Sequence, residues 1–268
     1  MTDTLKSAMA RLPVLEPGHV WLAGAGPGDP GLLTLHALAG LAEADIIVHD
    51  ALVDPRVLAL AHPGASFEFA GKRGGKPSLS QANITDRLIA LARARQRVLR
   101  LKGGDPCVFG RGGEEALALA AAGIPFRIIP GVTSGLAALT IASIPATMRG
   151  VNQALILVTG HCGEGEDAID WGALARAGQP IVLYMGLRNL DPIAAALMEA
   201  GLDPHEPVAV IASATQPDQR ILISELHRVA AETRELAFAA PAIIAIGAIV
   251  GVRAKLLALA FRIPEMVG

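Results

Sequence analysis

The sequence predicts an α/β protein of two domains, the first with a mainly parallel sheet and the second with a mixed sheet. Its length of 268 residues is long for one α/β domain and suits two. In the first half, short β-rich runs alternate with helical stretches, which is typical of a parallel sheet covered on both faces. Several runs end in glycine-rich turns. Ligands of such sheets bind where the loops follow the strands.

Five short runs in the first half have the composition of strands. They are residues 19–23, 45–49, 66–70, 97–101 and 126–129. Helices are expected between them because apolar residues recur near helical spacing, as Ile84, Leu88 and Leu91 do. The predicted helices are 32–43, 80–95 and 114–122. Two acids favour the start of the last one, since a helix N-terminus is the positive end of its dipole.

The second half repeats this pattern less regularly. The predicted strands are 154–159, 180–184, 208–212, 220–223 and 242–246, and the predicted helices are 173–177, 191–200 and 224–236. The last strands are partly too close together for helical crossovers, which predicts a mixed sheet. We place the boundary near Thr133, which gives domains of residues 14–132 and 133–262.

The bulk composition narrows the classes of function. A formal net charge of −2 gives no general attraction to nucleic acid or to an anionic membrane surface, so neither is expected as a partner. An anionic ligand would need a local basic cluster. Cys107 and Cys162 are too few for a disulfide framework and lack C-x-x-C spacing. We therefore expect no metal site and a reducing compartment.

One uncharged stretch, residues 236–252, approaches the length of a membrane-spanning helix. It is interrupted by Pro241, Gly247 and Gly251, and its isoleucine-rich part is typical of a buried strand. The start of the chain shows no basic region followed by an apolar run, so no signal peptide is expected. These features favour a cytoplasmic protein.

Two glycine-rich turns follow predicted strands. The first, Gly-Ala-Gly-Pro-Gly-Asp from Gly24, has Asp29 where a dinucleotide fingerprint needs its third glycine, and Pro27 removes a backbone donor. An NAD-dependent enzyme is therefore disfavoured. The second turn contains Asp105, which fits both a contact to a ribose or amino group and an acidic turn residue. Two close-approach loops without a phosphate cradle suit a nucleoside that carries no phosphate.

Four longer runs carry a recognisable pattern. They are residues 20–34, residues 44–53, the tripeptide from Gly71 to Arg73, and Arg-Leu-Lys-Gly-Gly-Asp-Pro-Cys-Val-Phe-Gly-Arg-Gly-Gly-Glu-Glu at 100–115. Together with shorter matches, they resemble the tetrapyrrole methylases from about residue 18 to residue 253. The run at 100–115 is more similar to uroporphyrinogen-III C-methyltransferases, including the methylase domain of siroheme synthases, than to later corrin-ring methylases.

The resemblance implies an active-site cleft between the two domains, a homodimer, and S-adenosyl-L-methionine as methyl donor. It implies that Asp50 accepts a proton and that Lys72 donates one. The implied cofactor contacts are Pro27, Gly103, Gly104, Asp105, Val108, Thr133, Ser134, Met185, Ala214 and Ala242.

The implied reaction methylates uroporphyrinogen III at positions 2 and 7, giving precorrin-2 and S-adenosylhomocysteine. The rim of this substrate carries carboxylates, which arginine can pair with through two hydrogen bonds. The candidate cations are Arg73, Arg111 and Arg149, with Lys76 and Lys102 in addition. Methylation of a later corrin precursor such as precorrin-4, or a non-catalytic cofactor-binding role, stay open as alternatives. So does whether the product serves cobalamin or siroheme biosynthesis.

Overall fold

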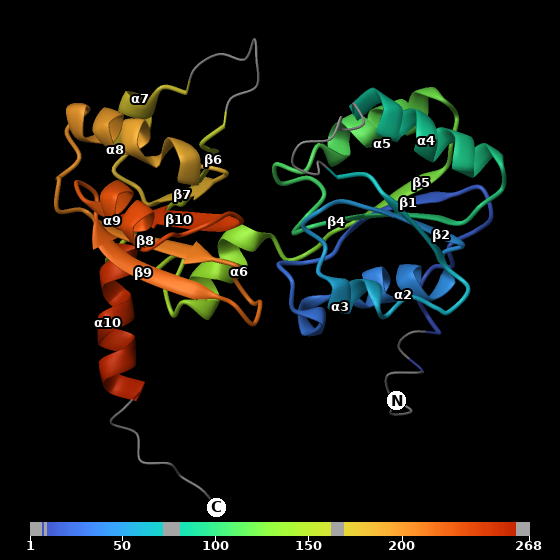
Figure 1. Cartoon of the computed structure of the whole chain (residues 1–268), viewed down its shortest axis with the longest axis horizontal. Coiled ribbons are helices and arrows are strands. Elements are labelled where there is room, and N and C mark those ends of the chain that lie inside the picture. Colours follow the sequence, from blue (N-terminus) through green and yellow to red (C-terminus); the bar gives the residue numbers. More distant parts are fainter. Residues whose placement is uncertain (1–6, 8–9, 72–80, 162–168, 261–268) are drawn as a thin grey trace, which may run out of the picture. The chain divides into compact units, whose positions relative to one another are not determined.

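The structure is a computed structural model that describes residue 7 and residues 10–71, 81–161 and 169–260. The chain divides into two compact units, Met1–Ser134 and Gly135–Gly268. Each unit is a five-stranded sheet with helices packed on it (Figure 1). The first sheet is parallel and the second is mixed. The predicted fold class is therefore confirmed.

The first sheet has the strand order β3-β2-β4-β1-β5. Its strands are β1 (Val20–Gly24), β2 (Ile46–His49), β3 (Ser66–Phe69), β4 (Val98–Lys102) and β5 (Phe126–Ile129). Helices α2 and α3 lie on one face, and α4 and α5 lie on the other (Figure 1). The helices of this unit are η1 (Pro30–Leu32), α2 (Leu35–Glu43), α3 (Pro55–Leu58), α4 (Gln81–Arg93) and α5 (Gly112–Ala121).

Alternation along the central strand β1 explains the two helical layers. Trp21 is buried in the cluster that includes Leu41 of α2. Its neighbour Leu22 points to the opposite face and is buried with Leu88 of α4 and Leu119 of α5. Successive side chains of a strand point to opposite faces, so a nearly continuous apolar strand needs cover on both sides.

The second sheet has the order β6-β7-β10-β8-β9, and β10 runs antiparallel to both of its neighbours. Its strands are β6 (Ile156–Thr159), β7 (Ile181–Tyr184), β8 (Pro207–Ala212), β9 (Arg220–Glu225) and β10 (Ala242–Ile246). One face packs against α7, α8 and α9. The helices are α6 (Ser134–Ile141), α7 (Trp171–Arg176), η2 (Leu187–Asn189), α8 (Leu190–Glu199), α9 (Val229–Glu235) and α10 (Ile249–Ala260).

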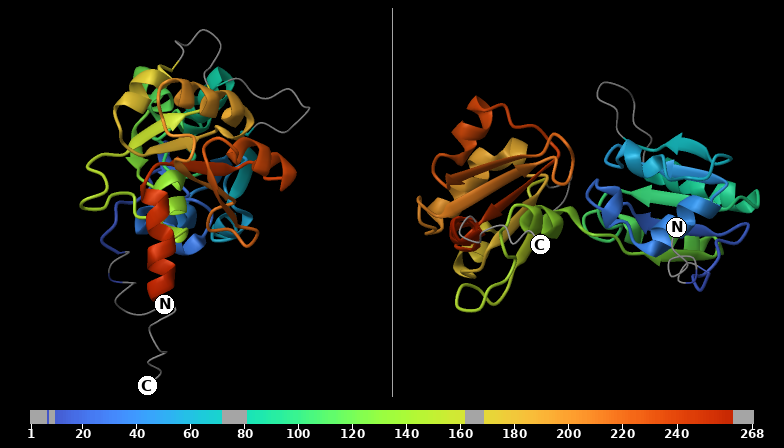
Figure 2. Two further views of the ribbon diagram at one scale, coloured as in Figure 1. Left: turned by 90° about the vertical axis from the view of Figure 1, so that its left-hand side faces the viewer. Right: turned by 90° about the horizontal axis from the view of Figure 1, so that it is seen from below.

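Three α-helices of this unit differ from the sequence expectation, and one of them is α6, which was not predicted. The helix predicted for 224–236 begins only at Val229, because Ser224 and Glu225 continue β9 and pair with β8. Helix α10 was not expected. It packs on β8 and β10 and extends beyond the sheet (Figure 2). Among the described residues, no helix is both long and apolar enough to cross a membrane.

Candidate active site

The first candidate region is the edge of the parallel sheet where the strands end. Register pairs Gly24 of β1 with Lys102 of β4, and His49 of β2 with Leu101 of β4. The loops that follow these three strands therefore start side by side. They carry Pro27, Asp50 and the segment 103–105, which are all predicted site residues.

The two glycine loops hold each other through their backbones. Gly26 N donates to Gly104 O at 3.1 Å, and Gly104 N donates to Gly26 O at 2.7 Å. A Cβ on Gly24 would lie 2.5 Å from Gly104 O and 2.6 Å from the Cα of Gly131. Glycine is thus required at position 24 because three loops meet there without space for a side chain.

The Asp105 side chain holds two of these loops together through hydrogen bonds. One carboxylate oxygen accepts from Cys107 N at 2.8 Å, and the other accepts from Gly131 N at 3.0 Å. The side chain therefore ties the loop after β4 to the loop after β5. Each carboxylate oxygen has a second lone pair, so this role leaves acceptor capacity for a ligand.

Asp50 follows β2 at the same edge and is partly exposed. Its Oδ1 accepts from Leu52 N at 2.9 Å, and its Oδ2 accepts from Gly103 N at 3.4 Å. The carboxylate is therefore held against the loop that carries the predicted cofactor contacts Gly103 and Gly104. This arrangement positions an acid beside the glycine loops.

Beneath this edge lies a buried ionic cluster that sequence reasoning missed. Glu115 of α5 is 0% exposed, and its Oε1 accepts from Arg100 Nε at 3.2 Å, Lys102 Nζ at 3.1 Å and Gln81 Nε2 at 3.0 Å. Within the described part of the chain, its Oε2 has no hydrogen-bond partner. The pKa of Lys102 is lowered, first by burial and then by the charge of Arg100.

This cluster changes the role of one candidate. Lys102 was considered a contact for substrate carboxylates, yet the structure buries it to 4% exposure against Glu115. The sequence does hold a signal for this. Arg100 and Lys102 are two apart in an otherwise apolar strand, so both side chains point to one face, the face that α5 covers.

The predicted cations fall in different places. Arg111 has φ 58° before α5, and its guanidinium makes two hydrogen bonds to Glu114, at 2.9 and 2.7 Å. Arg149 is exposed in the loop after α6 of the second unit. Lys72, Arg73 and Lys76 lie outside the described residues.

The remaining predicted cofactor contacts lie at loops and strand ends. Val108 is partly buried in the loop after β4, Thr133 directly precedes α6, and Ser134 is its first residue. In the second unit, Met185 follows β7, Ala214 lies two residues past β8, and Ala242 begins β10. Since β10 is antiparallel to its neighbours, its start lies beside the ends of β7 and β8.

This edge of the second sheet has unusual backbone conformations. Met185, Ser213 and Thr215 have φ values of 53°, 49° and 67°. Such left-handed residues other than glycine are uncommon and cluster at ligand sites. Met185 is also 53% exposed, although methionine side chains are mostly buried in cores. Met185 is itself a predicted contact, and Ser213 and Thr215 flank the predicted contact Ala214.

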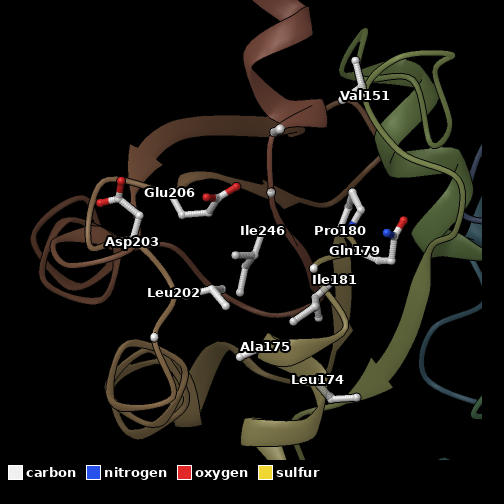
Figure 3. Close-up of a pocket in the computed structure, with 14 residues that line it drawn as sticks. Val151, Leu174, Ala175, Gln179, Pro180, Ile181, Leu202, Asp203, Glu206 and Ile246 are labelled. Atoms are coloured by element: carbon white, nitrogen blue, oxygen red, sulfur yellow. The ribbon is translucent and has the colours of Figure 1, made fainter.

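A cavity of about 260 Å³ lies at the opposite edge of the second sheet. It is lined by Pro180 and Ile181 at the start of β7, by Ile246 at the end of β10, and by Asp203 and Glu206 before β8 (Figure 3). None of the predicted cofactor contacts lines it. This cavity is therefore separate from both candidate edges.

Comparisons with known proteins agree on one family. A family model described as tetrapyrrole (corrin/porphyrin) methylases matches residues 19–230. A uroporphyrinogen-III C-methyltransferase from Sinorhizobium sp. is 53% identical over 249 residues, which are 92% of this chain and 89% of the relative. The siroheme synthase of Gluconacetobacter diazotrophicus is 44% identical over 87% of this chain, which spans 50% of that longer relative.

Solved structures of related enzymes support the same family. Uroporphyrin-III C-methyltransferase from Thermus thermophilus, complexed with S-adenosylhomocysteine, has 41% identity and a TM-score of 0.76, over 87% of this chain and 99% of that one. A cobalt precorrin-4 methyltransferase has a TM-score of 0.79 with 26% identity, over 90% of this chain and 99% of that one.

Proposed function

This chain belongs to the tetrapyrrole (corrin/porphyrin) methylase family, and on that premise we propose that it is a uroporphyrinogen-III C-methyltransferase. It transfers two methyl groups from S-adenosylmethionine to positions 2 and 7 of uroporphyrinogen III, giving precorrin-2 and S-adenosylhomocysteine. The observation that carries this proposal is the 53% identity to a uroporphyrinogen-III C-methyltransferase over 92% of the chain.

The carboxylates at the glycine loops of the first unit fit a nucleoside without phosphate. Asp29 caps the turn after β1, where its Oδ1 accepts from Gly31 N at 2.8 Å. The negative charge of a carboxylate at this position would repel a bound pyrophosphate. Arg56 also reaches this loop, but its guanidinium is paired with Asp54 at 2.9 Å. The neighbouring Asp105 offers acceptors that suit ribose hydroxyls or an ammonium group.

We assign the cofactor to the predicted contacts at both candidate edges. In the first unit these are Pro27, the segment 103–105 and Val108, followed by Thr133 and Ser134. In the second unit they are Met185, Ala214 and Ala242. The sulfonium supplies a methyl group that is already activated, so the protein needs no nucleophile of its own. Its task is to align the ring carbon with that methyl and to exclude water.

Asp50 is the proposed base. Attack on the methyl leaves positive charge on the pyrrole ring, and loss of a proton from the ring relieves it. A carboxylate within reach can take that proton. The backbone amides of Leu52 and Gly103 fix the Asp50 carboxylate at the loop edge. The roles of Lys72 as proton donor, and of Arg73, Arg111 and Arg149 as partners of substrate carboxylates, are part of the same proposal.

The test is an anaerobic incubation with uroporphyrinogen III and methyl-labelled S-adenosylmethionine, followed by mass analysis of the tetrapyrrole. A gain of two labelled methyl groups is the expected result. No gain, with S-adenosylmethionine binding intact by calorimetry, would reject the substrate. The same assay with a precorrin-4 substrate tests the later-corrin alternative, which 26% identity to a precorrin-4 enzyme does not favour.

The family resemblance also implies a homodimer, and the cysteine usage and the lack of a signal-peptide pattern favour a cytoplasmic protein; we include both in the proposal. Light scattering on the purified chain should give twice the mass of 27.6 kDa. A monomer mass at micromolar concentration would reject the dimer.

A further inference from the structure

We propose that His205, Glu225 and His227 form a binding site for a late first-row divalent cation, with Zn²⁺ as the best match. One ligand atom from each side chain can be chosen so that all three lie within 4.8 Å of one another. The site belongs to the second unit and takes no part in the proposed methyl transfer.

The three side chains converge on one carboxylate oxygen. His205 Nδ1 lies 2.9 Å from Glu225 Oε2, and His227 Nδ1 lies 3.6 Å from the same atom. The two imidazole rings meet edge to face, with centroids 5.1 Å apart. A simple ion pair would need only one histidine, whereas two imidazoles and a carboxylate are a common ligand set for Zn²⁺.

The ligand spacing is close to what Zn²⁺ requires. Bonds of about 2.0–2.1 Å in a tetrahedral site place ligand atoms about 3.3 Å apart. The 2.9 Å between His205 Nδ1 and Glu225 Oε2 is close to this value. His227 Nδ1 also lies 2.9 Å from Pro204 O and must donate to it, since a carbonyl only accepts. His227 therefore offers Nε2 as its ligand atom.

The backbone already holds the two contributing segments together. The register pairs Pro207 with Glu225 at the end of the β8–β9 ladder. Leu226 N donates to Glu206 O at 3.0 Å, and His227 N donates to Pro204 O at 3.0 Å. Only side-chain freedom is lost when a metal binds, so most of the ordering cost is met by the fold.

Exposure and charge at the cluster admit a cation. The side chains of His205 and His227 are 72% and 40% exposed, which leaves room for water as a fourth ligand. Asp203 accepts from His205 N at 2.8 Å and adds negative charge beside the site. Arg228 is the opposing cation nearby, and its pairing with Glu232 at 3.3 Å offsets its repulsion.

The site also adjoins the second unit's cavity. Asp203 and Glu206, which flank His205, line that cavity from one side (Figure 3). A metal would tie the segment before β8 to the end of β9. Binding to the folded state alone raises its stability in proportion to the logarithm of metal concentration. Metal binding at this site would therefore stabilise the folded second unit.

The experiment uses the full chain without a histidine tag, stripped with chelator and titrated with ZnCl₂ at pH 8 in a calorimeter. We expect one Zn²⁺ per chain with a Kd on the order of 10 µM or tighter, and no heat with MgCl₂. His205→Ala, Glu225→Gln and His227→Ala should each weaken binding by more than about tenfold, since even outer-shell changes cost about 10–100-fold.

Matched controls separate this site from binding elsewhere. His36→Ala, on α2 of the other unit, and Glu235→Gln, an exposed acid on α9, should retain wild-type Zn²⁺ affinity. Circular dichroism checks that every variant is folded, and methyl transfer should be unchanged in His227→Ala. Zn²⁺ affinity that survives all three ligand substitutions, or no binding at 100 µM ZnCl₂, would overturn the proposal.

Discussion

Replacing Glu115 by Gln should destabilise the first unit strongly. The carboxylate is fully buried and is the partner of both Arg100 and Lys102. The glutamine leaves two buried cations without a counter-charge, and removing one member of a buried ionic pair costs about 3–5 kcal/mol. Whole domains have stabilities of about 5–15 kcal/mol. The expected loss is therefore a large share of the free energy of unfolding of a whole domain.

The assay can report the first unit alone. The chain has two tryptophans: Trp21, buried in β1, and Trp171 in the second unit. In a Trp171→Phe background, urea unfolding followed by tryptophan fluorescence therefore monitors the first unit. With an m-value near 3 kcal/mol/M, the midpoint should fall by about 1–1.7 M. The matched control is the exposed neighbour Glu114→Gln, which should cost less than about 1 kcal/mol.

The effect should also depend on pH in a defined direction. Burial and Arg100 lower the pKa of Lys102, so above that pKa the unfolded chain binds more protons than the folded chain and stability rises with pH. Removing the Glu115 charge lowers the pKa of Lys102 further, so the variant should recover part of its loss as pH rises toward the ordinary lysine pKa of the unfolded chain. A midpoint within about 0.2 M of the parent at pH 7 would refute the reasoning.

Three further outcomes are expected. Asp50→Asn should lower methyl transfer by about 10²–10⁴-fold and leave S-adenosylmethionine affinity intact in calorimetry; unchanged turnover would remove it as the base. Gly24→Ala should destabilise the first unit more than Gly104→Ala in the same urea assay. A Cβ at position 24 meets backbone at 2.5 Å, whereas Gly104, at φ 68°, has no atom closer than 3.5 Å and carries mainly backbone strain. Asp54→Ala should cost about 1 kcal/mol at pH 7, because Asp54 caps α3 and pairs with Arg56. Arg56 lowers the pKa of Asp54, so this cost should shrink as pH falls through that pKa; a pH-independent cost would contradict the pairing.

The first sheet could be predicted because its strands are apolar and regularly spaced. The runs at 45–49 and 126–129 become β2 and β5 with little change at their ends. The start of α9 could not be predicted in this way. Ser224 and Glu225 suit a helix start as well as a strand end, and only pairing with Val208 and Pro207 of β8 decides between them. Such pairing is a tertiary effect, and the local sequence pattern contains no information about it.

The candidate site shows the same division between local and tertiary information. Motif spacing placed Asp50 and Asp105 after strands, and the parallel register brings their loops to one edge. The side-chain role of Asp105 and the close backbone approach at Gly24 both depend on contacts with Gly131, which is over 25 residues further along the chain. Sequence alone cannot separate a glycine kept for a ligand from one kept for a neighbouring loop.

The strained edge of the second sheet extends this argument. Met185, Ser213 and Thr215 are not residues that mark left-handed backbone, so no turn pattern predicts their conformations. Each conformation costs on the order of 1–3 kcal/mol and persists only where surrounding structure enforces it. Hydrogen bonds hold two of these residues: Ser213 N donates to Pro241 O at 3.0 Å, and Thr215 N donates to Gln219 Oε1 at 2.8 Å. Of the three strained residues, Met185 is itself a proposed cofactor contact, and Ser213 and Thr215 flank another, Ala214.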